Sequence, residues 1–290
     1  MLTRRSLLKH TALISGLGLC GFTANSGTES AKRKIRIGAC DWSIGKGSDP
    51  AAFALARQIG LEGIQVNLGS VANNLHLREK DLQRTYIEES KRTGIKIASL
   101  AIAELNRVPY KSDPRTEEWV WDAVDVAKNL DVRVILLAFF AENDLREDEP
   151  GKKEVIRRLK IVAPKAEKMG ITLGIESYLS AEEHMRIIDA VGSKAIKIYY
   201  DFRNSADAGY DVIKEIRWLG KDVICELHMK ENGSLLASGT LDWKKIAETL
   251  NEIGYYGDGW MQIEGARPEG ADIVGSYKEN HAFLREVFGM

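Results

Sequence analysis

The regular alternation of short apolar runs with longer amphipathic segments restricts the fold of this chain more than any other feature. The runs are rich in Val, Ile and Leu, and residues 132–138 are apolar almost without interruption. Runs of this kind are typical of strands that are buried on both faces of a parallel sheet. The eight predicted strands cover residues 35–40, 63–68, 95–101, 132–139, 171–176, 196–201, 223–228 and 260–264.

The segments between these runs carry signals of helix ends. Ser180 and Glu183 form a predicted capping box at the start of one helix. Glycine stands a few residues before most of the strands, where a helix can end in the left-handed conformation that glycine adopts at the lowest cost. These glycines are Gly60, Gly94, Gly170, Gly192, Gly220 and Gly254.

Successive βα units with right-handed crossovers form either an open doubly wound sheet or a closed barrel. An open sheet that binds nucleotides would be favoured by a glycine-rich loop after the first strand. Residues 41–47 read DWSIGKG and lack the GxGxxG spacing. Together with the strand count, this favours a single-domain (β/α)8 TIM barrel over residues 34–290, with no linker to divide it.

Residues 1–30 predict a separate segment that is removed from the mature protein. Residues 3–9, TRRSLLK, resemble the twin-arginine export motif, and an apolar run of 12 residues follows at 11–22. At 1.5 Å per residue this run is too short to span a bilayer core of roughly 30 Å. We expect a cleavable signal peptide, export to the periplasm or the extracellular space and no stable membrane span. An amphipathic N-terminal helix is the alternative, and a bulky Leu19 disfavours lipidation of Cys20.

The charge balance excludes some partners. The chain has 41 basic and 42 acidic residues and a net charge of −1, so a basic surface for nucleic acid is not expected. Cys40 and Cys225 lie in apolar runs, where buried free thiols are commoner than a disulfide. The oligomeric state stays open, a homo-oligomer included.

Four consecutive predicted strands carry a metal-competent side chain at or near their carboxyl ends. These side chains are Glu176, Asp201, His228 and Glu264. In a parallel barrel all strands end at the same rim, and active sites are built there. Converging carboxylates would repel one another without a cation, so we expect one divalent metal ion. Three carboxylates with one imidazole suit Mn²⁺ first, with Mg²⁺, Co²⁺ and Zn²⁺ as alternatives.

The residues around these ligands resemble a known superfamily. Residues 201–204 (DFRN) are similar to its D-x-x-N or D-x-x-H motif, and residues 228–230 (HMK) to its H-x-K motif. Residues 254–257 (GYYG), followed by Trp260 and residues 263–264 (IE), resemble its C-terminal motif. We therefore identify a resemblance to the xylose isomerase-like TIM barrels, specifically to the sugar phosphate isomerase/epimerase family.

This resemblance implies a metal-dependent isomerase or epimerase of a keto-sugar or a related hydroxy-ketone. Glu176 and Glu264 would remove and return a proton through an enediolate. One position departs from the family pattern. Asn204 stands where epimerases of free sugars tend to carry a histidine, and an asparagine cannot shuttle a proton.

Three alternatives use the same fold. A lyase or dehydratase that acts on an oxidised (3-keto) sugar, glycoside or cyclitol would start with the same proton abstraction, and export favours substrates without phosphate. A sugar-binding barrel without turnover is the second alternative, although the intact ligand set argues against it. An endonuclease IV-type enzyme would need more ligand histidines and a basic groove.

Further polar and aromatic residues follow the predicted strands. As contacts of a carbohydrate substrate we predict Trp42, Asn67, Glu104, Asn204 and Lys230, with a solvated lysine as the alternative for Lys230. Weaker candidates for the rim are His76, Asn106, Glu142 and Arg267. His184 and His281 lie in helical segments and are predicted to be surface residues.

Overall fold

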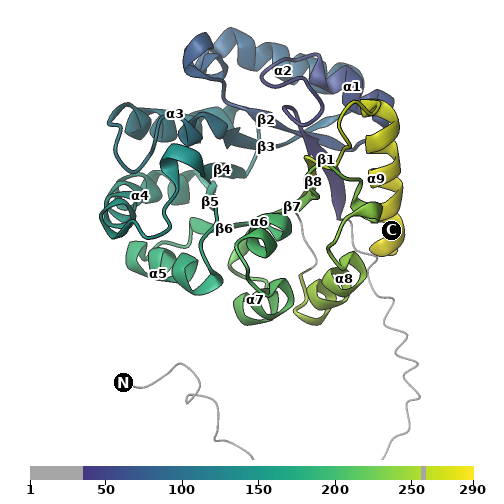
Figure 1. Cartoon of the computed structure of the whole chain (residues 1–290). Coiled ribbons are helices and arrows are strands. Elements are labelled where there is room, and N and C mark those ends of the chain that lie inside the picture. The colour runs from purple at the N-terminus through teal and green to yellow at the C-terminus, as the bar shows by residue number, and fades with distance from the viewer. Residues whose placement is uncertain (1–34, 256–258) are drawn as a thin grey trace, which may run out of the picture. The chain divides into compact units, whose positions relative to one another are not determined.

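A computed structural model describes residues 35–255 and 259–290. Its eight strands, in chain order, close into a barrel in which every strand is parallel to both neighbours (Figure 1). The predicted barrel is confirmed, and the predicted strand ends differ from the observed ones by at most two residues. The strands are β1 (Arg36–Cys40), β2 (Gly63–Asn67), β3 (Lys96–Ile102), β4 (Val134–Phe139), β5 (Thr172–Ser177), β6 (Ile196–Asp201), β7 (Ile224–Lys230) and β8 (Trp260–Glu264).

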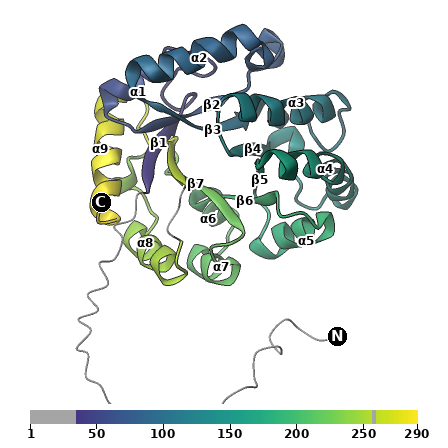
Figure 2. The same ribbon diagram turned by 180° about the vertical axis from the view of Figure 1, so that it is seen from behind.

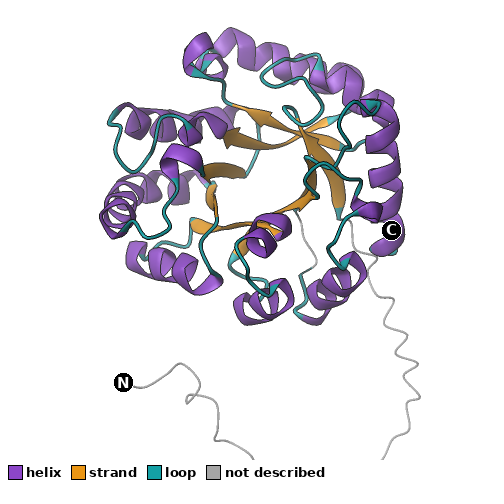
Figure 3. Cartoon of the chain, viewed as in Figure 1, coloured by secondary structure: helices purple, strands orange, loops and turns teal. Residues whose placement is uncertain are grey.

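Helices form a ring around the barrel, as views from both ends show (Figures 1 and 2). Colouring by secondary structure shows the same two layers, with the strands inside and the helices outside (Figure 3). The α-helices are α1 (Ala52–Ile59), α2 (Lys80–Thr93), α3 (Arg115–Asn129), α4 (Glu149–Met169), α5 (Ala181–Val191), α6 (Phe202–Asp207), α7 (Val212–Leu219), α8 (Trp243–Glu252) and α9 (Ile273–Val287). Short 3-10 turns lie in the loops at Val71–Asn73, His76–Arg78, Ala103–Asn106, Ala141–Asn143 and Leu236–Ser238.

The helix ends follow the sequence signals. All six glycines named above have a positive φ, between 67° at Gly220 and 94° at Gly60. The side chain of Ser180 accepts a hydrogen bond from Glu183 N, and the Glu183 side chain bonds back to Ser180 N, so the predicted capping box is confirmed. The signal segment at 1–30 lies outside the described residues, and export stays a prediction.

The buried apolar side chains form two clusters of unequal size. Most buried apolar side chains pack in one large cluster, whereas a separate small cluster holds Ala101, Leu136, Ala138 and Tyr199. Five polar side chains of the strands are at most 1% exposed: Gln65, Ser99, Glu226, His228 and Gln262. The buried residues of the strands therefore include a polar group as well as apolar side chains.

Two further sequence expectations concern the whole described chain. Cys40 and Cys225 are free thiols, the first buried and the second half-buried. Within residues 35–255 and 259–290, no helix combines the length and apolar character needed to cross a bilayer.

Candidate metal centre

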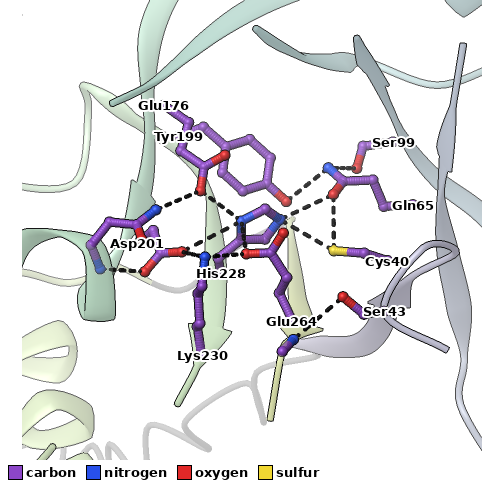
Figure 4. Close-up of polar contacts among 12 residues, drawn as sticks. Cys40, Ser43, Gln65, Ser99, Glu176, Tyr199, Asp201, His228, Lys230 and Glu264 are labelled. Atoms are coloured by element: carbon purple, nitrogen blue, oxygen red, sulfur yellow. Dashed lines mark hydrogen bonds and ion pairs between the residues drawn. The ribbon is translucent and has the colours of Figure 1, made fainter. Parts of the chain in front are cut away.

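The four predicted ligands converge at the carboxyl ends of β5 to β8. One ligand atom from each of Glu176, Asp201, His228 and Glu264 lies within 4.8 Å of all the others. His228 Nδ1 is at the centre, 2.9 Å from Glu176 Oε1, 3.8 Å from Asp201 Oδ2 and 3.5 Å from Glu264 Oε2. Figure 4 shows the three carboxylates gathered around one edge of the imidazole ring.

Burial and mutual repulsion shape the electrostatics of this cluster. Burial, together with the charges of Glu176 and Glu264, raises the pKa of Asp201 above its ordinary value. Burial acts in the same direction on Glu264, but His228 and Lys230 outweigh it and hold the pKa of Glu264 below its ordinary range. The pKa of His228 is raised, because the neighbouring carboxylates outweigh the effect of burial.

These donors fit a divalent cation. Asp201 Oδ2 is buried and has no hydrogen-bond partner among the described residues, although it faces the ligand atoms of the other three side chains. A cation at this point would satisfy that oxygen and offset the repulsion between the carboxylates. The donor set of oxygens with one nitrogen suits Mn²⁺, Mg²⁺ or Co²⁺, and Zn²⁺ also accepts it.

A second group of possible ligands combines Cys40 with His228 and Glu264. A cysteine binds metal as the thiolate. Burial raises the pKa of Cys40 to about 12, which opposes loss of the thiol proton. The oxygen-rich set offers four ligand atoms rather than three and is the better candidate metal site.

Three of the predicted substrate contacts touch the ligands directly. Trp42 Nε1 donates a hydrogen bond to Glu264 Oε1 at 2.8 Å, and Asn204 Nδ2 donates one to Glu176 Oε1 at 3.2 Å. Lys230 Nζ lies 2.9 Å from Glu264 Oε2 and 3.6 Å from Asp201 Oδ2. The alternative of a solvated Lys230 is therefore wrong.

Asn67 and Glu104 make no hydrogen bond to the four candidate ligands among the described residues. Their side chains instead accept hydrogen bonds from backbone N–H groups of the loops after β2 and β3. Asn67 Oδ1 accepts a hydrogen bond from Ala103 N at 3.3 Å, and Glu104 Oε1 accepts one from Val71 N at 3.1 Å. Glu104 is only 6% exposed. Both residues connect the loops after β2 and β3, and contact with a substrate stays a prediction for them.

The histidine predictions need one clear correction. His184 is buried rather than on the surface, because its ring lies between Ser177 Oγ, 2.9 Å from Nε2, and Ser180 O, 3.0 Å from Nδ1. The helical pattern placed it on α5 but could not show that this face of α5 packs on the end of β5. His281 is half-buried.

The weaker rim candidates have varied positions. Glu142 is exposed, and Arg267 is held in its own loop by a hydrogen bond from Nη1 to Ala271 O at 2.6 Å. Asn106 Oδ1 accepts a hydrogen bond from Phe140 N at 3.0 Å. His76 is half-buried in the loop before α2, and its Nε2 has no hydrogen-bond partner among the described residues.

Sequence reasoning missed the polar layer beneath the ligands. Gln65 Oε1 is 3.0 Å from His228 Nε2, and Gln65 Nε2 donates to Ser99 Oγ and Tyr199 OH, each at 3.0 Å. Burial raises the pKa of Glu226 to about 8, against hydrogen bonds from Ser99 and Tyr199. The available signal was a polar residue inside an apolar strand, as at Gln65, or two positions before a ligand, as at Glu226, because alternate residues of a strand share a face.

Asp41 was also missed. It is fully buried at the end of β1, and its Oδ2 accepts hydrogen bonds from Ser48 N at 2.9 Å and Asn67 N at 3.0 Å. Burial raises its pKa to about 7. Asp41 thus ties the loop that carries Trp42 to the end of β2.

Two curated relatives match parts of this chain. The 3-oxo-isoapionate decarboxylase of Pectobacterium atrosepticum is 27% identical over 141 residues, which cover 43% of this chain and 50% of that protein. The D-psicose 3-epimerase of Enterocloster bolteae is 28% identical over 133 residues, 43% of each chain. The chain thus spans about half the length, or less, of the curated relatives it matches.

Solved structures match the fold over most of the chain. D-psicose 3-epimerase from Clostridium cellulolyticum H10, with D-tagatose, has a TM-score of 0.74 at 17% identity and covers 88% of this chain and 99% of its own. The 3-keto-D-glucoside 4-epimerase from E. coli has a TM-score of 0.70 at 15% identity and covers 87% and 100%. The sequence also matches the xylose isomerase-like TIM barrel family over residues 53–287, and this chain therefore belongs to that family.

Proposed function

We propose that this chain is an enzyme that isomerises or epimerises a keto-sugar, or a related hydroxy-ketone, with one divalent metal ion. The observation that carries the proposal is the convergence of Glu176, Asp201, His228 and Glu264 within 4.8 Å at the barrel rim. We propose Mn²⁺ as the ion, with Mg²⁺, Co²⁺ and Zn²⁺ compatible with the same donors. Bound there, the ion would polarise a substrate carbonyl and acidify the adjacent C–H bond.

Glu176 and Glu264 are the proposed proton carriers. One carboxylate takes the proton from the carbon beside the carbonyl, and the electron pair of that C–H bond is delocalised as an enediolate. The other, in its protonated form, returns a proton to the opposite face, which inverts the carbon. Each positioned acid or base contributes about 10² to 10⁴-fold to the rate.

The neighbours of the two glutamates support these roles. Lys230 at 2.9 Å favours the ionised form of Glu264, which is the form of a base. Trp42 fixes Oε1 of the same carboxylate. Asn204 fixes Oε1 of Glu176, and Glu176 Oε2 makes no hydrogen bond within the described part of the chain. That oxygen is therefore available to the substrate.

The substrate class is a proposal that rests on Asn204 and on the relatives. An asparagine at this position holds Glu176 but shuttles no proton, which separates this site from that of free-sugar epimerases. One relative is named for a 3-oxo acid and one structural neighbour for a 3-keto glucoside. We propose an oxidised, unphosphorylated sugar or glycoside that is met outside the cytoplasm after export.

A lyase or decarboxylase is the second candidate function. The decarboxylase among the relatives favours it. The site suits the first step of either reaction, because both epimerisation and the lyase reaction begin with an electron pair that is stabilised beside a polarised carbonyl. A sugar-binding barrel without turnover is the third reading.

Metal analysis tests the first part of the proposal. We expect about one metal equivalent in the purified protein and a loss of most of it in Glu176→Gln, because a neutral amide replaces a charged ligand. Glu182→Gln is the matched control, since Glu182 is exposed on α5. A wild-type protein that binds no divalent ion would overturn the metal-dependent reaction.

Solvent exchange tests the reaction. Ketoses and 3-keto glycosides are incubated with the protein in deuterated water, and products are analysed by NMR and mass spectrometry. Deuterium beside the carbonyl supports epimerisation, and Glu264→Gln should reduce its incorporation at least about 10²-fold. Loss of CO₂ or of a leaving group would identify the lyase. No deuterium with any substrate would favour the binding protein.

A further inference from the structure

The imidazole of His228 has two sides with different partners. Nδ1 faces the three carboxylates of the candidate metal centre, and Nε2 faces away from them into the barrel. On that second side lie Gln65 Oε1 at 3.0 Å and Cys40 Sγ at 3.4 Å (Figure 4). A histidine can present Nδ1 to a metal only when the remaining proton is on Nε2.

The amide of Gln65 lies between two hydroxyl groups on its nitrogen side and His228 on its oxygen side. Its Nε2 donates to two hydroxyl groups, those of Ser99 and Tyr199, each at 3.0 Å. Its Oε1 then faces His228 Nε2 and also accepts from Cys40 Sγ at 3.2 Å. An amide oxygen only accepts, so His228 Nε2 must be the donor in this contact.

The Gln65 amide and its neighbours are fully buried. Gln65 is 0% exposed, as are Ser99, Cys40 and His228. The ring of Tyr199, which anchors the Gln65 amide through its hydroxyl, also lies 4.6 Å from the His228 ring, centroid to centroid. The same side chain thus limits rotation of the imidazole and fixes the group that accepts its proton.

We propose that Gln65 is a positioning residue of the metal centre, which holds His228 as the Nε2–H tautomer and so directs the lone pair of Nδ1 to the metal. The inference rests on the proposed function, because it assigns the side chain that supports the metal site. Gln65 does not touch the carboxylates and would act only through His228. Partners of this kind typically change metal affinity about 10 to 100-fold.

Co²⁺ titration of the full protein tests the proposal, followed by the visible absorption of the bound ion. Gln65→Met has a similar length but no acceptor, and we expect its Co²⁺ affinity to fall about 10 to 100-fold with an altered spectrum. Gln65→Glu keeps an acceptor toward Nε2, and it should stay close to wild type in both measurements. If Gln65→Met does not fold, Gln65→Asn, in which the acceptor is one methylene further from the ring, should show the same loss.

Gln262→Met is the matched control. Gln262 is also 0% exposed and pairs with His228 in the β7–β8 register, but it makes no hydrogen bond to that ring within the described residues. We expect near wild-type Co²⁺ binding in this variant. An equal loss in Gln262→Met and Gln65→Met would overturn the proposal, because interior packing alone would then explain it.

A second measurement reads the hydrogen bond itself. In the Zn²⁺-loaded protein, the ring Nε2–H of His228 should exchange slowly with water in wild type and in Gln65→Glu, and fast in Gln65→Met. Equal exchange and equal Co²⁺ affinity in wild type and Gln65→Met would refute the role of Gln65 but leave the metal site intact. A wild-type protein that binds no metal would instead refute the proposed function, and this inference with it.

Discussion

At the scale of single residues, the candidate metal ligands are held by other side chains that hydrogen bond to them. Trp42 is the clearest case, because its indole N–H contacts Glu264 Oε1 from the loop after β1. Hydrogen bonds to charged groups contribute about 1.5 to 3 kcal/mol. A residue outside the ligand set can therefore control both the position and the proton affinity of a proposed catalytic carboxylate.

We predict that Trp42→Phe lowers kcat/KM about 10-fold, the lower end of that range. The hydrogen bond from Trp42 helps to lower the pKa of Glu264, so its loss should raise that pKa and move the acid limb of the pH–rate profile to higher pH. Trp121→Phe, on the exposed face of α3, is the control. An unshifted acid limb in Trp42→Phe would contradict this role.

At the scale of elements, the connection between β5 and α5 is fixed by a neutral histidine. His184 on α5 and Ser177 at the end of β5 are hydrogen bonded at 2.9 Å, and Ser177 Oγ also accepts from Leu179 N at 3.0 Å. Ser177 directly follows Glu176, a candidate metal ligand. Burial lowers the pKa of His184 to about 4, from an ordinary value of 6.5.

This shift predicts a loss of stability in acid. As the pH falls from about 6.5 to about 4, the unfolded chain takes up a proton on His184 before the folded protein does, so folding loses about 3 kcal/mol from this group. The raised pKa values of Asp41 and Glu226 stabilise the folded protein as the pH falls, which is the opposite effect. Both residues are present in wild type and in the His184 variant, so their contribution cancels in the comparison.

The measurement is urea unfolding of wild type and His184→Gln between pH 7 and pH 4. The difference between the two free energies of unfolding should change by about 3 kcal/mol over this range, with wild type the more sensitive to acid. His281→Gln is a control for a half-buried histidine. Parallel pH profiles of wild type and His184→Gln would show that His184 is not a buried neutral group.

At the scale of the whole molecule, the candidate metal site joins four neighbouring strands of a closed barrel. The ligands come from β5, β6, β7 and β8, which are adjacent and hydrogen bonded in that order. An ion at the site would therefore bind only the folded barrel, because the ligands are far apart in the unfolded chain. Metal binding should then raise the free energy of unfolding of the whole domain.

We predict that metal at about 100 times its Kd stabilises the protein by about 2.7 kcal/mol. Thermal unfolding with metal and with EDTA measures this as a rise in Tm. Asp201→Asn should abolish most of the rise, whereas Asp222→Asn, in the loop before β7, should keep it. An equal Tm with metal and EDTA would show that the ion does not bind this site.

The sequence determined the barrel and the candidate ligand set. Both follow from chain order: alternating apolar runs fix the strands, and parallel strands in a barrel all end at one rim. Glu176, Asp201, His228 and Glu264 could therefore be placed together without knowledge of their distances. The glycine signals identified helix ends for the same reason, since they depend only on local conformation.

Contacts across the barrel were decided by the tertiary structure. Gln65 and Tyr199 meet inside it, and the strand register shifts at both residues, between Ile64 and Gln65 and between Ile198 and Tyr199. A shift of one residue exchanges the two faces of a strand, so pattern alone could not bring these side chains to His228. The burial of His184 depends on how α5 packs on the finished barrel, and the ion pairs of Lys230 depend on the register of β7 against its neighbouring strands. Chain order thus determined which residues reach the rim, whereas packing and strand register determined which side chains support them.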